Sequence, residues 1–290
     1  MRIAIASGKG GTGKTILAVN LALSSDCAQL LDCDVEEPNA HLLLKPVSVT
    51  EEVVEIPVPK IIEERCNYCG ECARFCQYRA LFVVGETALV FPQLCHSCGG
   101  CVIVCSKSAL VEEPRRIGMV LEGKSRDINL VYGELDVGEP LTVPLISAVK
   151  KRARVSGTVI MDAPPGTACP LVEVVDGADY CVLVTEPTPF GLHDLEIAAE
   201  VVSRLGVPYG VVVNFAETGD RGVYNFCDQK GIPILMEIPF NRRVAELYSR
   251  GVPFIEEMPE WREKFRDLTD KIRNILERES NGLAVRIEGY

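Results

Sequence analysis

Eight of the thirteen cysteines in this 290-residue chain stand at regular intervals within one short stretch. They form two runs with the spacing C-x2-C-x2-C-x3-C, which repeat each other at an offset of 29 residues. Three thiolates at two-residue gaps can turn toward one iron–sulfur cubane, whereas the fourth thiolate points at the other cubane in two-cluster proteins. Two [4Fe–4S] clusters with crossed ligands are therefore expected, held by Cys66, Cys69, Cys72 and Cys105 and by Cys95, Cys98, Cys101 and Cys76.

Zinc is the simpler alternative for these cysteines. A tetrahedral zinc site usually needs only two C-x2-C pairs, so the third cysteine of each run would be surplus. Residues about 60–112 resemble a bacterial-type ferredoxin domain with two [4Fe–4S] clusters, which implies an electron-transfer module. One departure is that Gln77 and Ser106, rather than proline, follow the fourth cysteine of each run, which bears on the local turn and the cluster potentials. Because all eight thiolates are present, His96 is expected at the surface or beside the ligands.

A glycine-rich segment near the N-terminus could hold phosphate groups. Residues 8–15, GKGGTGKT, fit the pattern G-x4-G-K-[ST], and they follow a strand-like run over residues 2–6 and open a helix. In such a loop the backbone N–H groups and the helix N-terminus bind phosphate oxygens. Lys14 is expected to reach the β- and γ-phosphates of ATP or ADP, and Thr15 is expected to bind Mg²⁺. The expected nucleotide contacts are Gly8, Gly10, Gly11, Thr12, Gly13, Lys14 and Thr15.

Lys9 is a second lysine that an ordinary phosphate loop does not need. The segment KGGTGKT resembles the deviant Walker A motif of the MinD/ParA family, to which the nitrogenase iron protein and the Mrp-type cluster carriers are related. In that family the early lysine crosses a dimer interface to the partner's nucleotide. The resemblance therefore implies an ATP-dependent homodimer in which Lys9 and Lys14 both serve ATP hydrolysis.

The same resemblance assigns roles to several residues at strand ends. Asp32 and Asp34 in LLDCD resemble switch I, which makes Asp34 the candidate for orienting the attacking water and places Asp32 in the surroundings of Mg²⁺. Asp162 in TVIMDAPPGT resembles the Walker B and switch II segment, where it would hold Mg²⁺ through water. Gly166 would offer its N–H to the γ-phosphate. Two further residues resemble the family's adenine contacts: Asn214 and Pro239.

Strand-like and helical runs alternate along the rest of the chain. This alternation predicts an α/β fold with a largely parallel P-loop NTPase sheet and helices on both faces. Ligands of such sheets bind beyond the carboxyl ends of the strands, where the phosphate loop would meet Asp34, Asp162 and Asn214. The cysteine repeat interrupts the pattern between the two switches. The predicted domains are an ATPase formed by residues 1–58 and 113–290 and an inserted small α+β ferredoxin domain formed by residues 59–112.

Composition and charge narrow the functional classes. The formal net charge of −11 argues against a nucleic-acid binder, which needs a positive field. No uncharged apolar stretch is long enough to span a membrane and the N-terminus lacks the features of a signal peptide, so a cytoplasmic protein is expected. The amphipathic segment about 259–278 is expected to pack on the domain rather than on a membrane, because the tail NGLAVRIEGY ends with acidic and glycine residues.

Five cysteines lie outside the repeat. Cys181 stands in an apolar strand and is expected in the core. Cys33 and Cys169 keep open roles. Cys169 follows Asp162 by seven residues, at an offset similar to that of a cluster-holding cysteine of the nitrogenase iron protein. A redox or transient metal role for Cys169 at a dimer interface is therefore a hypothesis.

Three functions are compatible with these motifs. The leading hypothesis is an ATPase that couples nucleotide-driven dimerisation to electron transfer through two clusters, toward a partner protein or metallocofactor. The second is an ATPase that assembles or carries iron–sulfur or other metal clusters. Relatives of that kind use a C-x2-C near the C-terminus, and no cysteine follows Cys227 here. The third is a spatial organiser of the ParA or MinD type, which the acidic charge disfavours.

Overall fold

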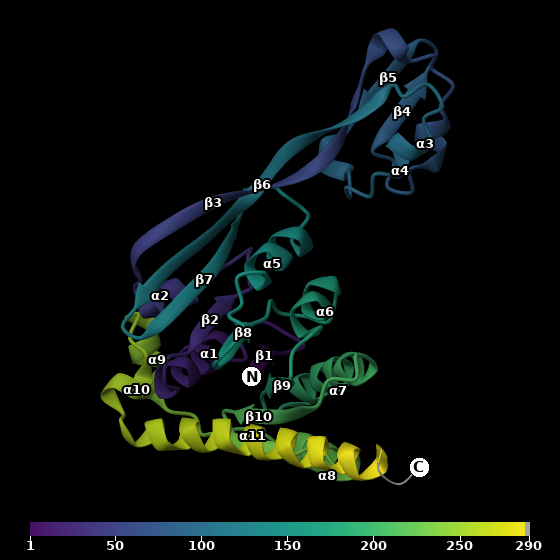
Figure 1. The fold of residues 1–290 in the computed structure, drawn as a ribbon. Coiled ribbons are helices and arrows are strands. Elements are labelled where there is room, and N and C mark those ends of the chain that lie inside the picture. Colours follow the sequence, from purple (N-terminus) through teal and green to yellow (C-terminus); the bar gives the residue numbers. More distant parts are fainter. Residues whose placement is uncertain (288–290) are drawn as a thin grey trace. The chain divides into compact units, whose positions relative to one another are not determined.

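The computed structural model describes the backbone of residues 1–287 and the side chains of residues 1–278 (Figure 1). The strands are β1 (Arg2–Ala6), β2 (Gln29–Asp32), β3 (Val47–Ile61), β4 (Leu81–Val84), β5 (Thr87–Val90), β6 (Leu110–Ser125), β7 (Ile128–Leu135), β8 (Val159–Asp162), β9 (Tyr180–Thr185), β10 (Tyr209–Asn214) and β11 (Ile234–Ile238). The α-helices are α1 (Lys14–Ser24), α2 (Ala40–Leu44), α3 (Glu71–Phe75), α4 (Gly100–Ile103), α5 (Val143–Lys150), α6 (Cys169–Val175), α7 (Pro189–Arg204), α8 (Gly222–Lys230), α9 (Arg242–Ser249), α10 (Phe254–Glu257) and α11 (Glu260–Ile287). Two 3₁₀ turns are η1 (Glu63–Arg65) and η2 (Pro92–Leu94).

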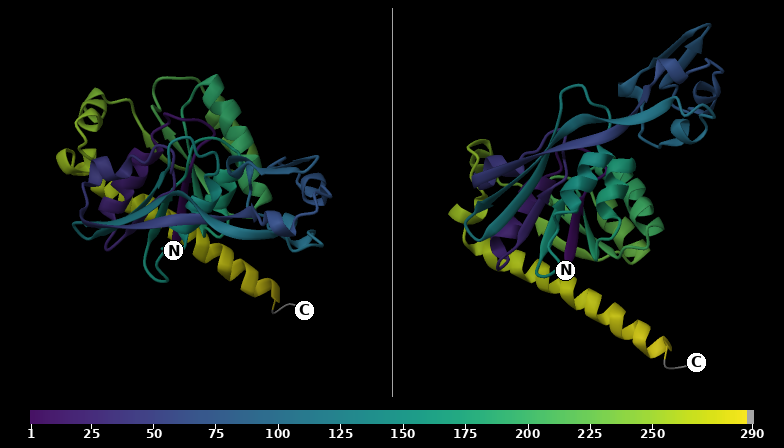
Figure 2. Two further views of the ribbon diagram at one scale, coloured as in Figure 1. Left: turned by 90° about the horizontal axis from the view of Figure 1, so that it is seen from above. Right: turned by 45° about the horizontal axis from the view of Figure 1, so that its top comes forward.

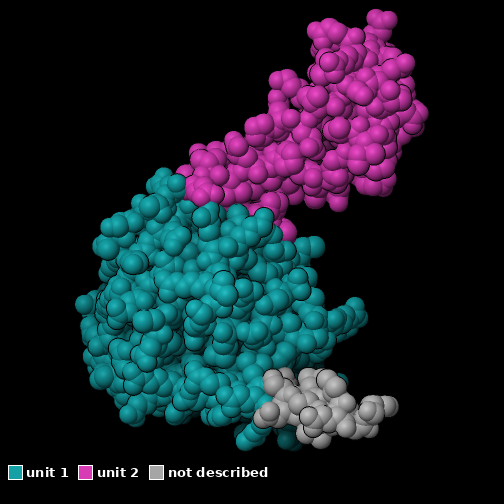
Figure 3. Space-filling view, in the orientation of Figure 1, with its two compact units in different colours: residues 1–51, 120–134, 146–290 teal, residues 52–119, 135–145 magenta. Residues whose placement is uncertain are grey.

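The chain divides into two compact units (Figure 3). Unit 1 comprises residues 1–51, 120–134 and 146–290, and unit 2 comprises residues 52–119 and 135–145. The chain passes from unit 1 into unit 2 within β3 and returns within β6. All eight cysteines of the repeat belong to unit 2, whereas the phosphate loop belongs to unit 1.

The central sheet of unit 1 is largely parallel. Within residues 1–287, nine strands join in the order β11-β10-β9-β1-β8-β2-β7-β6-β3, and every neighbouring pair from β11 to β7 is parallel. The predicted α/β fold with a largely parallel sheet is therefore confirmed. Asp32 on β2 pairs in register with Asp162 on β8, so both carboxylates reach the same edge of the sheet. This edge is the one at which β1 passes into the phosphate loop.

Helices cover both faces of this sheet (Figure 2). Parallel strands are joined by right-handed crossovers, and α1 moves along the sheet in the direction opposite to α6, α7 and α8, so the two groups lie on opposite faces. On the first face α11 packs against α1 and buries Phe265, Leu268 and Ile272 completely. The sequence-based bounds of about 259–278 are too short for α11, which continues to Ile287. The last part of the tail, residues 288–290, lies outside the described residues.

Unit 2 is built from two copies of one backbone pattern. The turn η1 and helix α3 precede and follow the first loop of cysteines, as η2 and α4 do in the second. Left-handed φ angles recur at the repeat offset, at Tyr68, Gly70 and Arg79 in the first copy and at Ser97, Gly99 and Ser108 in the second. The copies also exchange matching hydrogen bonds: the N–H of Phe91 donates to Ala80 O at 2.8 Å, and the N–H of Ile62 donates to Ala109 O at 2.7 Å. The sequence repeat is therefore a structural repeat with reciprocal contacts.

Candidate functional site

The phosphate loop of unit 1 connects β1 with α1. Glycine is required at several of its positions, for different physical reasons. Gly11 and Gly13 have φ angles of +79° and +93°, in the left-handed region that favours glycine. At Gly8, a Cβ atom would lie 2.3 Å from the carbonyl oxygen of Asp194. At Gly13, it would lie 2.6 Å from Nδ2 of Asn214. Close packing behind the loop therefore restricts these positions independently of any nucleotide.

Lys14 begins α1 beside a group of carboxylates. Burial lowers the pKa of Lys14, whereas the charges of Asp162 and Asp34 raise it. Asp162 is completely buried, and neither of its carboxylate oxygens has a hydrogen-bond partner of good geometry among the described residues. Burial raises the pKa of Asp162 well above 3.8, the Asp32 carboxylate acts in the same direction, and Thr15 and Lys14 act against it. The edge of the sheet therefore holds a buried carboxylate that is incompletely compensated.

These residues fit a magnesium ion. The Thr15 hydroxyl and the Asp162 carboxylate are hard oxygen donors of the kind that Mg²⁺ prefers. A divalent cation, held through its water, would supply the partner that the buried oxygens of Asp162 lack. A magnesium ion bound with a nucleotide stabilises the charge on the phosphate groups. The predicted roles of Thr15 and Asp162 are thus chemically consistent with their surroundings.

We expect Asp162→Asn to stabilise the nucleotide-free protein while weakening its affinity for Mg²⁺ and nucleotide. The asparagine amide has nearly the same shape as the carboxylate and removes its buried charge. The free energy of unfolding should therefore rise by about 1–3 kcal/mol at pH 8. Because the folded pKa of Asp162 is raised, the wild type loses stability relative to the variant as pH increases from 3.8, and the difference should vanish toward that value. Urea unfolding at several pH values measures the difference. Asp127→Asn, at an exposed turn, is the control, and a destabilised Asp162→Asn would contradict the assignment.

Asp32 organises the loop that follows β2. Its carboxylate accepts hydrogen bonds from the N–H groups of Asp34 at 3.1 Å, Asn39 at 3.0 Å and Ala40 at 3.0 Å. Burial nevertheless raises the pKa of Asp32 to about 7, because the three donors offset it only in part. Burial also raises the pKa of Asp34 to about 6, against the effect of Lys14. The sequence did not indicate this backbone role of Asp32, which holds the loop of Asp34 and the start of α2.

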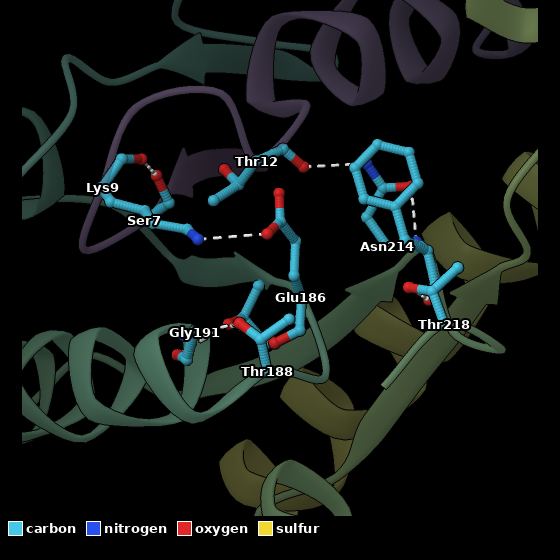
Figure 4. Close-up of polar contacts among 10 residues, drawn as sticks. Ser7, Lys9, Thr12, Glu186, Thr188, Gly191, Asn214 and Thr218 are labelled. Carbon is cyan, nitrogen blue, oxygen red and sulfur yellow. Dashed lines mark hydrogen bonds and ion pairs between the residues drawn. The ribbon is translucent and has the colours of Figure 1, made fainter. Parts of the chain in front are cut away.

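Lys9 has an acidic partner that the sequence analysis missed. Its Nζ lies 3.0 Å from Oε2 of Glu186 (Figure 4), and both side chains are partly shielded from solvent. Ser7 fixes the same turn because its hydroxyl donates to Lys9 O at 2.5 Å. Glu186 follows the end of β9 at the carboxyl edge of the sheet, where Thr188 caps α7 by accepting from the Gly191 N–H. The feature of the sequence that could have revealed Glu186 was its position directly after a strand. That strand, β9, pairs with β1.

Asn214 lies behind the phosphate loop at the end of β10. Its Nδ2 donates to the carbonyl oxygen of Thr12 at 2.8 Å, and its Oδ1 accepts from the N–H of Phe215 at 3.0 Å (Figure 4). Pro239 directly follows the neighbouring strand β11, and the rings of Phe240 and Phe215 have centroids 5.8 Å apart. These residues share one edge with the loop. The adenine contacts of Asn214 and Pro239 stay predictions.

Gly166 is positioned by the loop after β8. It has a left-handed φ of +98°, and its N–H donates to the carbonyl oxygen of Ser7 at 3.2 Å. This bond links the predicted switch II segment to the first residue after β1. The N–H is therefore already engaged, and the predicted contact with a γ-phosphate requires that the bond to Ser7 be exchanged.

The cysteines of unit 2 gather in two groups. Cys76, Cys95, Cys98 and Cys101 all line one small cavity, which we call the second site. Burial raises the pKa of Cys101 to about 11, and the neighbouring Cys95 and Cys98 contribute. Burial also raises the pKa of Cys72, with contributions from Cys105 and Cys66. These three cysteines belong to the predicted set Cys66, Cys69, Cys72 and Cys105, which we call the first site. Cys69 is exposed.

Backbone groups donate to several of these sulfur atoms. The N–H of Ala80 lies 3.3 Å from Sγ of Cys76, and the repeat-related N–H of Ala109 lies 3.3 Å from Sγ of Cys105. The N–H of Ser97 lies 3.4 Å from Sγ of Cys95. Such donors favour thiolate ligands over neutral thiols. Among the residues described, no three His, Cys, Asp or Glu side chains converge closely enough to hold a single metal ion.

The remaining cysteines divide by burial. Cys181 is fully buried in β9, as expected for a core residue, and Cys227 is buried in α8. Cys33 is fully buried, and burial raises its pKa well above 9.0, so the thiol stays protonated. Cys169 begins α6 and is exposed, which leaves its redox role a hypothesis.

A strand, a glycine-rich loop and a helix, with a buried lysine and carboxylates at the carboxyl edge of a parallel sheet, define a P-loop nucleotide-binding protein. The chain belongs to the CobQ/CobB/MinD/ParA nucleotide binding domain family, whose profile matches residues 3–254.

Individual relatives agree with this membership. An uncharacterized protein of Methanocaldococcus jannaschii is 32% identical over an alignment of 284 residues, and the alignment covers 95% of this chain and 96% of the relative. An iron–sulfur cluster carrier protein of Pyrococcus abyssi is 24% identical over 88% of this chain and 79% of its own length. The septum site-determining protein MinD of Pyrococcus horikoshii, solved with Mg-ADP, has the same fold, with a TM-score of 0.58 and 18% sequence identity. The comparison covers 95% of this chain and 98% of that chain. None of the described helices is long and apolar enough to cross a bilayer.

Proposed function

We propose that this protein is an ATPase that couples nucleotide binding to electron transfer through two [4Fe–4S] clusters in unit 2. The observation that carries the proposal is the crossed grouping of cysteines. Cys76 lines a cavity with Cys95, Cys98 and Cys101 from the other run, and Cys105 lies near Cys72 and Cys66. A pair of independent zinc loops would keep each run together, whereas two cubanes exchange the fourth ligand.

The residues present suit such clusters. Eight thiols form two sets, and backbone N–H groups donate to sulfur in both. Each cluster, when bound, accepts and passes on one electron. The protein's own groups would set the potential at which this occurs, through hydrogen bonds to sulfur and through exclusion of water. We therefore retain the inserted ferredoxin domain, residues 59–112, as part of the proposal.

The nucleotide part of the proposal assigns ATP hydrolysis to unit 1. Lys14 would bind the β- and γ-phosphates, Thr15 and Asp162 would hold Mg²⁺, and Asp34 would orient the attacking water. The loop of Asp34 leads directly into α2 and then into β3, which carries the chain into unit 2. A change in this loop on hydrolysis therefore has a continuous covalent route toward the cysteines, through the 15 residues of β3.

The proposed ATP-dependent homodimer requires Lys9 to leave Glu186. A partly shielded ion pair is worth about 1 kcal/mol, and each homodimer opens two of them, so their opening opposes dimer formation by about 30-fold. Glu186→Gln should therefore lower the protein concentration needed for the ATP-bound dimer by about 30-fold. Light scattering with a non-hydrolysable ATP analogue measures this concentration. Glu200→Gln, which removes the exposed pair with Arg204, is the matched control. An unchanged or weakened dimer in Glu186→Gln would contradict the proposal that the Lys9–Glu186 ion pair opposes dimer formation.

The function is tested on protein purified without oxygen. Iron analysis should give about eight iron ions per chain, as two four-iron clusters require. Adding ATP and Mg²⁺ should change the electron paramagnetic resonance spectrum of the reduced clusters, and ADP should not reproduce the change. Zinc in place of iron, or spectra indifferent to ATP, would refute the coupling.

A cluster carrier is the second candidate, and the similarity to the Pyrococcus abyssi carrier supports it. Labelled iron distinguishes the two functions. Incubation with an apo-ferredoxin should leave the label on this protein if it transfers electrons. Transfer of the label, accelerated by ATP, would instead establish the carrier function.

A further inference from the structure

The repeat of unit 2 allows the two sites to be compared residue by residue, and it fails at the positions that flank them. Tyr78 follows Cys76 by two residues, and the residue equivalent to Tyr78 beside the first site is Lys107. His96 follows Cys95 directly, and the residue equivalent to His96 beside the first site is Asn67. The backbone repeats while these side chains change from aromatic to polar or cationic.

The aromatic pair forms a wall of the second site. The rings of Tyr78 and His96 are stacked with centroids 3.6 Å apart and an interplanar angle of 9°. Both line the cavity that contains the four cysteines of the second site, and both also have solvent-exposed surface. The stack therefore lies between the cavity and water. Asn67 and Lys107 are exposed as well, but neither has a ring with which to build such a wall.

Two further differences add aromatic cover and negative charge to the second site. The Phe75 ring lies so close to Gly100 that a Cβ atom there would come within 2.2 Å of it, and Phe75 also lines the cavity. Glu112 adds a carboxylate to the lining of the second site, where the repeat-related residue of the first copy is Val83. Beside the first site, Glu71 is paired with Arg74 and adds no net charge.

We propose that the two clusters are inequivalent, with the second site screened from water by the Tyr78–His96 stack and lower in reduction potential than the first site. The inference rests on the proposed function. Adding one electron to an anionic cluster is favoured by water and by a nearby ammonium group, and disfavoured by aromatic cover and a nearby carboxylate. Lys107 thus raises the potential of the first site, whereas the stack and Glu112 lower that of the second.

This order gives electron transfer a direction. A low-potential one-electron donor reduces the second site, and the electron then passes to the first site without a proton. The first site, bordered by Asn67 and Lys107, is the exit toward an acceptor. An acceptor with acidic groups around its own redox centre suits the Lys107 side.

Redox titration with dithionite, followed by electron paramagnetic resonance at a single pH, tests the inference. The wild type should show two one-electron steps. Tyr78→Ala should increase the reduced-to-oxidised ratio of the lower step about tenfold at a fixed potential, which is about 59 mV for one electron. The upper step should stay in place. Lys107→Gln should shift only the upper step, downward.

Controls separate this inference from the proposed function. Tyr78→Phe keeps the stack and should retain both wild-type steps, and Tyr248→Ala changes an exposed tyrosine of unit 1 and should also leave both unchanged. Fewer than about eight iron ions in the wild type would contradict the proposed function itself. Full iron with coincident steps, or with steps that ignore both Tyr78→Ala and Lys107→Gln, would overturn only the inequivalence. Should Tyr78→Ala lose iron, Lys107→Gln alone decides.

Discussion

Lys14→Met is expected to lower kcat/KM for ATP hydrolysis by at least about 100-fold, which corresponds to roughly 2.7 kcal/mol of transition-state stabilisation. The side chain at the start of α1 is buried, and the charges of Asp162 and Asp34 favour its ammonium form. Lys9 is not expected to replace it, because the proposed homodimer directs Lys9 to the nucleotide of the partner protomer. Methionine keeps the length of the side chain without the charge.

The same substitution should leave the clusters intact and remove their response to ATP. Iron content and the dithionite-reduced spectrum should equal those of the wild type, since unit 2 does not contain Lys14. Lys151→Met, at an exposed position, is the control. Phosphate release and spectra with and without ATP are measured on all three proteins. Hydrolysis above about a tenth of the wild-type rate would disprove the role of Lys14, and an ATP response without hydrolysis would separate binding from turnover.

Pairs of cysteine substitutions should reveal the crossed ligands directly. Cys76→Ser alone should remove one cluster and leave about four iron ions. Cys76→Ser combined with Cys101→Ser should lose no more iron than either substitution alone, because both residues belong to the second site. Cys76→Ser combined with Cys72→Ser should lose both clusters, although these two cysteines lie in the same run.

The opposite pattern distinguishes the alternative. If each run held its own metal, Cys76 and Cys72 would act as one site, and Cys76 and Cys101 as two. Cys27→Ser, outside the repeat and exposed, is the control and should retain about eight iron ions. Iron analysis and the number of reduction steps are read together, so that a partly loaded cluster is not counted as a lost one.

The helices, strands and phosphate loop could be predicted from the sequence because they depend on short-range patterns. The alternation of strands and helices predicted the parallel sheet, and the glycines of the loop are required by backbone conformation near them in the chain. Glu186 was missed because its contact with Lys9 depends on the register of β9 against β1, which no local pattern specifies. The contact of Gly8 with Asp194 has the same cause.

The details of side chains at the sites were also beyond the sequence. Asp32 looked like a metal neighbour, and only the folded loop shows that it accepts three backbone N–H groups. His96 was expected near the surface or the ligands, but its stacking on Tyr78 arises where the two cysteine runs meet in space. Such contacts join residues that are distant in the chain, so they follow from the fold and not from spacing.

The incompletely compensated carboxylate of Asp162 has a consequence for resistance to proteolysis. A buried charge without full compensation lowers the free energy of local opening, and proteases act on opened chains. Each tenfold rise of a bound ligand above its dissociation constant adds about 1.4 kcal/mol to the folded state. Bound magnesium and nucleotide are therefore expected to slow proteolysis of the protein as well as to take part in its turnover of ATP.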